Sequence, residues 1–245
     1  MDLTRDFITA VQETAAPSEI DYSGRKFVDK HLNALPRAIT AAPLGTETLT
    51  SIVDYIMSGT DSKVLSEDGN GKFVIHIAGH VDVELYRELN ADKGRDNLIS
   101  ASFEGSNFPY GRFQPIENFI INLQSLFVQD DNVKELLEFV GSVKNDSSAE
   151  QTDDGVSQKV TVKQGISLAR VAKVPNPVYL RPYRTFSEIE QPQSAFVFRL
   201  RKDEVHGVTA ALFEADGAAW KHEAILSIKE YLSEKLKDQP VIILA

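Results

Sequence analysis

The chain of 245 residues contains no cysteine. This absence excludes a disulfide, an iron–sulfur cluster, a thiolate nucleophile and a zinc finger with cysteine ligands. The sequence also lacks any run of about 18 apolar residues, so no membrane-spanning helix is expected. Its first residues, from Met1 to Asp6, lack the basic segment and apolar run that mark a secretory signal. We therefore expect a protein of the cytoplasm.

Basic residues are outnumbered by acidic ones. The chain has 26 Lys and Arg residues against 36 Asp and Glu residues, which gives a formal net charge of −10. This charge repels a phosphate backbone unless cations are concentrated locally. Hydrophobic residues make up 42% of the chain and charged residues 25%, which indicates a globular protein and excludes disorder over the whole length. The length corresponds to one or two domains.

Five segments have the 3.6-residue apolar period of a helix. The expected helices are a first one that ends before Pro17, a second from a cap at Thr46 or Thr48 to Gly59, a third from Pro115 through Phe127, a fourth capped by Asp131, and a last one from Asp216 or Gly217 to Pro240. The third and fourth are close enough in sequence to form an αα-hairpin. For residues 21–45, helix and strand are both left open.

Alternating apolar and polar residues indicate strands elsewhere. The longest expected strand runs from Phe73 to about Tyr86, after a short strand at 63–66 and a turn at 67–71. Further strands are expected at 98–104, 156–163, 166–174, 178–184, 195–201 and 208–213, with a buried apolar strand at 241–244. The pattern predicts an α+β fold with mixed or antiparallel sheets, about five helices and a C-terminal unit of β-hairpin, helix and strand.

The most polar stretch of the chain lies at residues 145–154. Such a stretch is typical of a loop or of a boundary between two lobes. We therefore expect an N-terminal α+β lobe at 1–145 and a C-terminal β-rich lobe with the long final helix at 146–245. A single continuous domain is the alternative.

Several motifs gather in the second half of the chain. They are TDDGVSQ at 152–158, VPNPV at 174–178, RPYRTF at 181–186, EQP at 190–192, FVFRLR at 196–201 and LFEADGAAWK at 212–221. Through these motifs the chain resembles an uncharacterised family of bacteriophage and prophage proteins, and residues 48–56 and 119–125 resemble it more loosely. The resemblance implies a phage origin and expression inside a bacterial cell. It implies no activity and no catalytic residue.

A first candidate site lies on the polar face of the expected strand at 73–86. His76, His80, Asp82 and Glu84 alternate there, and imidazoles and carboxylates are ligands for zinc, manganese or iron. In a strand, residues i and i+4 lie about 13 Å apart, which is too far to share one ion. Only neighbours such as His80 and Asp82 would cooperate, with ligands from other segments. The alternative is an ordinary solvent-facing sheet surface.

A second candidate is the pair Glu214 and Asp216, at an expected junction between a strand and a helix. Two carboxylates at this spacing suit Mg²⁺ or acid–base chemistry. The alternative is structural: Asp216 caps the final helix, where free amide groups accept a carboxylate.

A third candidate is a cluster of arginine and tyrosine residues. Its members are Tyr179, Arg181, Tyr183, Arg184, Arg199 and Arg201. A sheet that displays them would bind phosphate through guanidinium groups and stack bases on tyrosine. Alternatively, these arginines pair with carboxylates of the same chain or of a neighbouring subunit.

The sequence lacks the common nucleotide-binding and hydrolase motifs. Together with the resemblance, which implies a phage origin, and with many strands whose edges need partners, this absence predicts a non-enzymatic, phage-encoded binding protein without a cofactor, which forms a homo-oligomer. We expect it to act in phage DNA metabolism or against a host defence, by binding a host or phage protein, a nucleotide or a single-stranded nucleic acid, and not a membrane. The alternative is a metal-dependent hydrolase or nuclease that uses the histidine, aspartate and glutamate residues of the first two sites.

Overall fold

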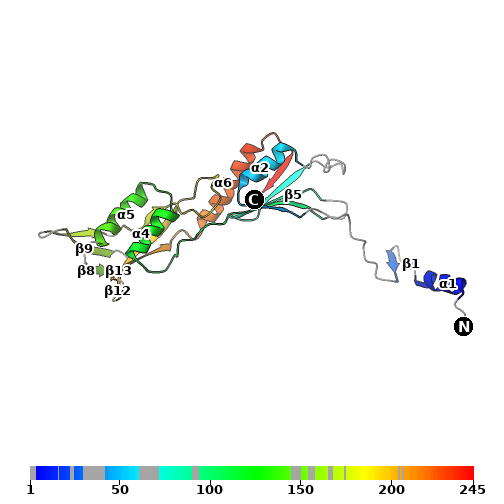
Figure 1. Ribbon diagram of the computed structural model, residues 1–245, viewed down its shortest axis with the longest axis horizontal. Coiled ribbons are helices and arrows are strands. Elements are labelled where there is room, and N and C mark those ends of the chain that lie inside the picture. Colours follow the sequence, from blue (N-terminus) through cyan, green and yellow to red (C-terminus); the bar gives the residue numbers. More distant parts are fainter. Residues whose placement is uncertain are drawn as a thin grey trace. The chain divides into compact units, whose positions relative to one another are not determined.

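The computed structural model describes residues 4–15, 17–22, 25–29, 42–60, 72–89, 94–144, 150–153, 158–164, 168–173, 175–203, 205 and 207–245. The chain divides into two compact units, Met1–Ala41 and Ala42–Ala245. The first unit contains helix α1 (Arg5–Ala15) and an antiparallel pair, β1 (Glu19–Tyr22) with β2 (Arg25–Val28) (Figure 1). For residues 21–45 the sequence left helix and strand open, and in the structure residues 25–28 form a strand.

A five-stranded mixed sheet forms one part of the second unit. Its strands lie in the order β14 (Val241–Leu244), β4 (Phe73–Ile77), β5 (Asp82–Arg87), β6 (Asn97–Ser102) and β3 (Leu44–Thr46). The three central strands are antiparallel, and each outer strand runs parallel to its neighbour. Figure 1 shows α2 (Leu49–Ser58) and α6 (Ala219–Lys235) together beside this sheet. The helices and the sheet share a core that includes Ile52, Leu85 and Ile228.

The ends of α2 are those that the sequence predicts. The side chain of Thr48 accepts a hydrogen bond from the backbone N–H of Ser51, and Gly59 has the left-handed φ of 63°. A hydroxyl at the N-cap and a glycine just after the last turn satisfy backbone groups that the helix leaves unpaired. Both expected caps are confirmed.

A four-stranded antiparallel sheet forms the second part of this unit. Its order is β11 (Val178–Leu180), β12 (Ser194–Asp203), β13 (Gly207–Glu214) and β7 (Gln114–Pro115). Helices α4 (Ile116–Leu126) and α5 (Asp131–Lys144) form the expected αα-hairpin and share a core with the sheet. This core is rich in aromatic rings, among them Phe119, Phe196 and Phe198. The expected cap of α5 was one residue off: Asp130, not Asp131, accepts from the backbone N–H of Val133.

A separate three-stranded sheet has the order β10 (Leu168–Lys173), β9 (Gln158–Gln164) and β8 (Glu150–Asp153), with antiparallel pairing. The two longer strands agree with the expected ones. Residues 150–153 are a strand and not the predicted loop, because the backbone of a polar segment pairs as readily as that of an apolar one when a neighbouring strand is present. The short strand and turn expected at 63–71 lie outside the described residues.

The fold belongs to the α+β class, with mixed and antiparallel sheets and five helices among the described residues. The C-terminal unit of hairpin (β12 and β13), helix (α6) and strand (β14) is confirmed.

The lobe boundary expected at residue 145 falls at residues 145–149, which the structure does not describe. Each core combines residues from both sides of it, such as Phe119 with Phe198 and Ile75 with Ile228. Within the described residues, no helix has both the length and the apolar character needed to cross a membrane.

Two strand predictions were wrong. The single strand expected at 73–86 is a hairpin, β4 and β5, whose turn contains Gly79 and His80. Ile77 pairs directly with Val83, six positions later in the sequence, so the alternation with a period of two continues through the turn and hides it. The apolar closing strand β14 is not fully buried: it lies at the edge of its sheet, and Ile242 and Leu244 are 44% and 48% exposed.

Candidate functional site

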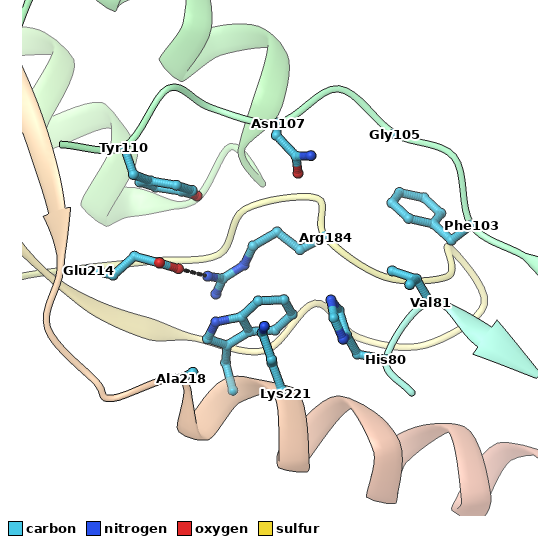
Figure 2. A pocket seen from close by; sticks show the side chains of 11 residues that line it. His80, Val81, Phe103, Gly105, Asn107, Tyr110, Arg184, Glu214, Ala218 and Lys221 are labelled. Atoms are coloured by element: carbon cyan, nitrogen blue, oxygen red, sulfur yellow. Dashed lines mark hydrogen bonds and ion pairs between the residues drawn. The ribbon is translucent and has the colours of Figure 1, made fainter. Parts of the chain in front are cut away.

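A pocket of about 450 Å³ lies where four segments of the second unit meet. The β4–β5 turn contributes His80 and Val81, and the chain after β6 contributes Phe103, Gly105, Asn107 and Tyr110. The remaining lining residues are Arg184, Glu214, Ala218, Trp220 and Lys221 (Figure 2). Cavities of a few hundred Å³ that combine aromatic walls with a few convergent polar groups are typical of small-ligand sites.

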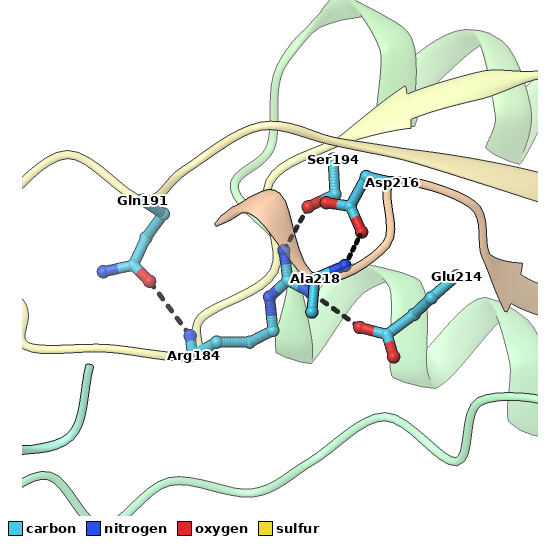
Figure 3. Close-up of polar contacts among 6 residues, drawn as sticks. All are labelled: Arg184, Gln191, Ser194, Glu214, Asp216 and Ala218. Carbon is cyan, nitrogen blue, oxygen red and sulfur yellow. Dashed lines mark hydrogen bonds and ion pairs between the residues drawn. The ribbon is translucent and has the colours of Figure 1, made fainter. Parts of the chain in front are cut away.

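Arg184 is the central residue of this pocket. Its side chain is only 5% exposed, and its guanidinium group donates to Glu214 Oε1 at 3.0 Å and to Ser194 Oγ at 2.5 Å (Figure 3). The guanidinium carbon lies 3.7 Å from the centre of the Trp220 ring. Stacking on an aromatic face and an ion pair together compensate the cost of burying the charge.

The loop that carries Arg184 is held by one amide side chain. Gln191 Oε1 accepts from the backbone N–H groups of Arg184, at 2.9 Å, and Thr185, at 3.3 Å. Its Nε2 donates to the backbone carbonyls of Thr185 and Phe186. The Thr185 hydroxyl then donates to the His80 carbonyl at 2.5 Å. These bonds fix Arg184 in place relative to the β4–β5 turn.

His80 packs against the tryptophan. Its ring meets the Trp220 ring edge-on, with 4.7 Å between the ring centres. Burial lowers the pKa of His80 from its ordinary value of 6.5, and the positive charges of Lys221 and Arg184 lower it further, against an opposing effect of Asp82. His80 is therefore a neutral imidazole at pH 7.

Three buried donors of pocket residues have no acceptor among the described residues. They are Arg184 Nε, Trp220 Nε1 and the Tyr110 hydroxyl. The Tyr110 ring stacks on Phe196, and burial strongly raises the pKa of Tyr110, so its hydroxyl stays protonated and able to donate. Because buried polar groups are nearly always hydrogen-bonded, three such donors among the residues of one pocket are unusual.

The start of α6 forms the edge of the pocket. Asp216 Oδ1 accepts from the Ala218 N–H at 3.1 Å, and Gly217 and Ala218 both have left-handed φ angles, 61° and 65°. Ala218 occupies the N-cap position without a side-chain bond to the helix. Asp216 therefore shapes the turn before the helix, and it does not cap the helix in the way that the sequence suggested.

The six candidate metal ligands do not gather at one point. His76 and Glu84 face each other across β4 and β5, with 3.6 Å between Nδ1 and Oε2, and Asp82 accepts from the Ser102 hydroxyl. His80 lies in the turn and lines the pocket instead. Among the residues that the structure describes, no group of three or more histidine, aspartate or glutamate side chains is placed to hold a metal ion.

The arginine and tyrosine cluster is also divided. Only Arg184 lines the pocket. Arg181 pairs with Glu190, as the alternative interpretation expected, and the exposed fractions of Tyr179 and Tyr183 are 50% and 45%. On the four-stranded sheet, strand pairing and alternation place Tyr179, Arg199 and Arg201 on a common face, where the Arg201 guanidinium lies 4.3 Å from the centre of the Phe113 ring.

Sequence reasoning missed two important residues of this site and assigned a third, Trp220, to the core without a role in the pocket. Tyr110 lies in a segment without apolar periodicity, and Gln191 has no local pattern that indicates its bonds to the 184–186 backbone. Trp220 is buried, as its position on the apolar stripe of α6 predicts, but its ring forms a wall of the pocket. A signal for this site was present in the sequence, because the RPYRTF, EQP and LFEADGAAWK motifs each contribute a residue to it.

Comparisons of this chain with protein-family models, with curated proteins and with solved structures found no match.

Proposed function

We propose that the protein is a phage-encoded binding protein that recognises a small ligand in the Arg184–Trp220 pocket and does not transform it. The observation that carries this proposal is the set of three buried donors without acceptors at a single pocket. A ligand with oxygen acceptors would satisfy them, and the free energy of those bonds would favour binding.

The polar side chains in and beside the pocket are arranged to bind a ligand and not to catalyse a reaction on it. Glu214 is held by Arg184, Asp216 Oδ1 accepts from a backbone amide, and His80 has its ring against Trp220. A general base needs a lone pair directed at a substrate proton, and a nucleophile needs such a base beside it. Among the described residues that line the pocket, none is a serine or threonine that could act as such a nucleophile.

The setting of this function follows from the sequence. We place the protein in the cytoplasm of the bacterial host, in phage DNA metabolism or in opposition to a host defence, which is where the resemblance to phage proteins puts it. The ligand class that best fits the expectation of nucleotide or nucleic-acid binding is one with a phosphate oxygen, because phosphate offers several acceptors to guanidinium and N–H donors.

Self-association is part of the proposal. β14 lies at the edge of the five-stranded sheet, and its Val-Ile-Ile-Leu sequence has neither the charge nor the proline that keeps edge strands from pairing. Light scattering after size exclusion is expected to give a homo-oligomer. Ile242→Lys is expected to dissociate it, whereas a wild-type protein that remains monomeric at high concentration would remove this part of the proposal.

Binding is tested with Trp220, which is the only tryptophan of the chain and therefore reports on the pocket alone. A panel of nucleotides, short single-stranded oligonucleotides and phage or host peptides is titrated while tryptophan emission is recorded. At least one class of probe is expected to change the emission with a saturable curve. If every class leaves the emission unchanged, and calorimetry detects no heat, the pocket is not a ligand site.

A further inference from the structure

The two ends of the pocket differ in chemistry. Figure 2 shows Tyr110 and Glu214 at one end, Phe103 and Val81 at the other, and Arg184 between them. The first end contains the unpaired Tyr110 hydroxyl and the Glu214 carboxylate that pairs with Arg184, and the second contains the apolar side chains of Phe103 and Val81. A ligand that fills the whole pocket therefore needs an acceptor-rich group joined to an apolar, flat group.

The charges of the residues that line the pocket determine which charge the acceptor-rich group of the ligand should carry. Arg184 and Lys221 contribute two positive charges and Glu214 one negative charge, while His80 is neutral. The Arg184 charge is already compensated by Glu214, and Asp216 acts on it from nearby. Lys221 forms no ion pair within the described part of the chain, and its Nζ lies 5.7 Å from the centre of the Trp220 ring. Among the lining residues, one positive charge, that of Lys221, is left for a ligand.

We infer that the pocket binds a ligand that joins a planar ring to a singly charged oxyanion, and that this ligand is a nucleoside 3′,5′-cyclic monophosphate. This inference rests on the proposed function. The phosphodiester has one charge and several acceptor oxygens for Tyr110, Trp220 and Lys221. A 5′-monophosphate carries about −1.5 to −2 at pH 7, and the surplus charge would be repelled by Glu214 and Asp216.

At the apolar end, the ring of Phe103 packs directly against Gly105. A Cβ built at Gly105 would lie 2.5 Å from the Phe103 ring, so any larger residue must displace that ring. Phe103 also meets Phe186 edge-on, with 6.2 Å between ring centres, which limits where it can move. The Gly105–Phe103 contact therefore sets the space that the ring of the ligand occupies.

The test is isothermal titration calorimetry of the full chain with defined probes near pH 7. The probes are a 3′,5′-cyclic nucleotide, the matching 5′-monophosphate, the matching nucleoside, inorganic phosphate and benzoate. The cyclic nucleotide is expected to bind about tenfold more tightly than the 5′-monophosphate, and the nucleoside and inorganic phosphate are expected to bind most weakly. Benzoate distinguishes a nucleotide site from a general site for ring-bound oxyanions: tighter binding of benzoate would overturn the assignment to nucleotides.

Three variants locate the binding. Lys221→Gln and Tyr110→Phe are each expected to weaken cyclic-nucleotide binding about tenfold, the effect of one lost charged or donor contact. Gly105→Ala is expected to weaken it through the displaced Phe103 ring. Lys229→Gln, which alters an exposed lysine on the same helix, is the matched control and is expected to bind as the wild type does.

The outcomes separate this inference from the proposed function. Preference for the 5′-monophosphate, or equal binding of the nucleoside, would overturn the inference and leave the pocket as a ligand site. Binding that survives Lys221→Gln and Tyr110→Phe but is lost in Arg199→Gln with Arg201→Gln would move the site to the four-stranded sheet. No binding of any ring-bound oxyanion also overturns the inference, and the wider panel with Trp220 emission then decides the proposed function.

Discussion

The guanidinium group of Arg184 stacks on the ring of Trp220, with 3.7 Å between the guanidinium carbon and the ring centre. The two residues come from different elements, the loop after β11 and the first turn of α6. The same guanidinium group pairs with Glu214 at the end of β13. A single buried cation thus joins three segments at the wall of the pocket, and the pocket depends on it.

Removal of this cation is expected to cost stability. Arg184→Ala loses the stacking on Trp220, the ion pair and the packing of the side-chain stem, for a combined loss of about 3 kcal/mol in the free energy of unfolding. Glu214→Gln keeps a hydrogen-bond acceptor and is expected to lose about 1 kcal/mol. Urea denaturation followed by circular dichroism measures both. An Arg184→Ala variant as stable as the wild type would show that the stack contributes nothing.

Tyr110→Phe is expected to act in the opposite direction on the free protein. The variant removes a buried hydroxyl that has no acceptor among the described residues, and leaving such a group unpaired costs about 1–3 kcal/mol. We expect the free energy of unfolding to rise by about 1 kcal/mol while ligand affinity falls. The melting temperature, measured with and without cyclic nucleotide, checks both effects. A fall in the stability of the free variant would show that the hydroxyl is already hydrogen-bonded.

The turn before α6 gives a paired prediction. Gly217 and Ala218 both have left-handed backbone angles, which cost a residue with a Cβ about 1 kcal/mol. Gly217→Ala is therefore expected to lower the free energy of unfolding by about 1 kcal/mol, and Ala218→Gly to raise it by roughly 0.5 kcal/mol after the entropy cost of glycine. Denaturation curves of the two variants check the signs. If both variants change stability in the same direction, the left-handed turn is not the reason.

How much of this architecture the sequence predicts depends on how local its cause is. The caps of α2 at Thr48 and Gly59, the β12–β13 hairpin and the apolar stripe of α6 were predicted, because each depends on neighbours within a few positions. The β4–β5 hairpin was missed because its turn preserves the alternation of the flanking strands. In both cases the pattern reports the face of a side chain and not the path of the backbone.

The pocket could not be predicted from local sequence patterns, because its residues are far apart in the chain. The hydrogen bond between Thr185 and the His80 carbonyl joins residues that are 105 positions apart, and Tyr110 and Trp220 are further apart still in the chain. No periodicity indicates that these segments meet. Arg184 was predicted to bind phosphate, and His80 and Glu214 were predicted as metal ligands, but each was grouped with residues that the structure places elsewhere.

The stability of the protein is expected to depend on pH through His80. Because burial lowers its pKa in the folded state, the unfolded chain takes up a proton first as the pH falls below 6.5, and protonation then favours unfolding. The contribution of His80 is therefore complete above pH 6.5 and is lost as the pH falls through its folded pKa. Thermal melts at several pH values should show a shallower decline for His80→Gln than for the wild type. Parallel curves would contradict the assigned direction.

The most direct test of the pocket is the ¹H–¹⁵N NMR signal of the indole N–H of Trp220, which is the only indole in the chain. This N–H has no acceptor among the described residues and would gain one when a cyclic nucleotide binds. The account predicts a saturable shift of this signal to lower field, with the same midpoint as calorimetry and a weaker midpoint in Lys221→Gln. A nucleotide that binds by calorimetry while the indole signal stays in place would contradict it.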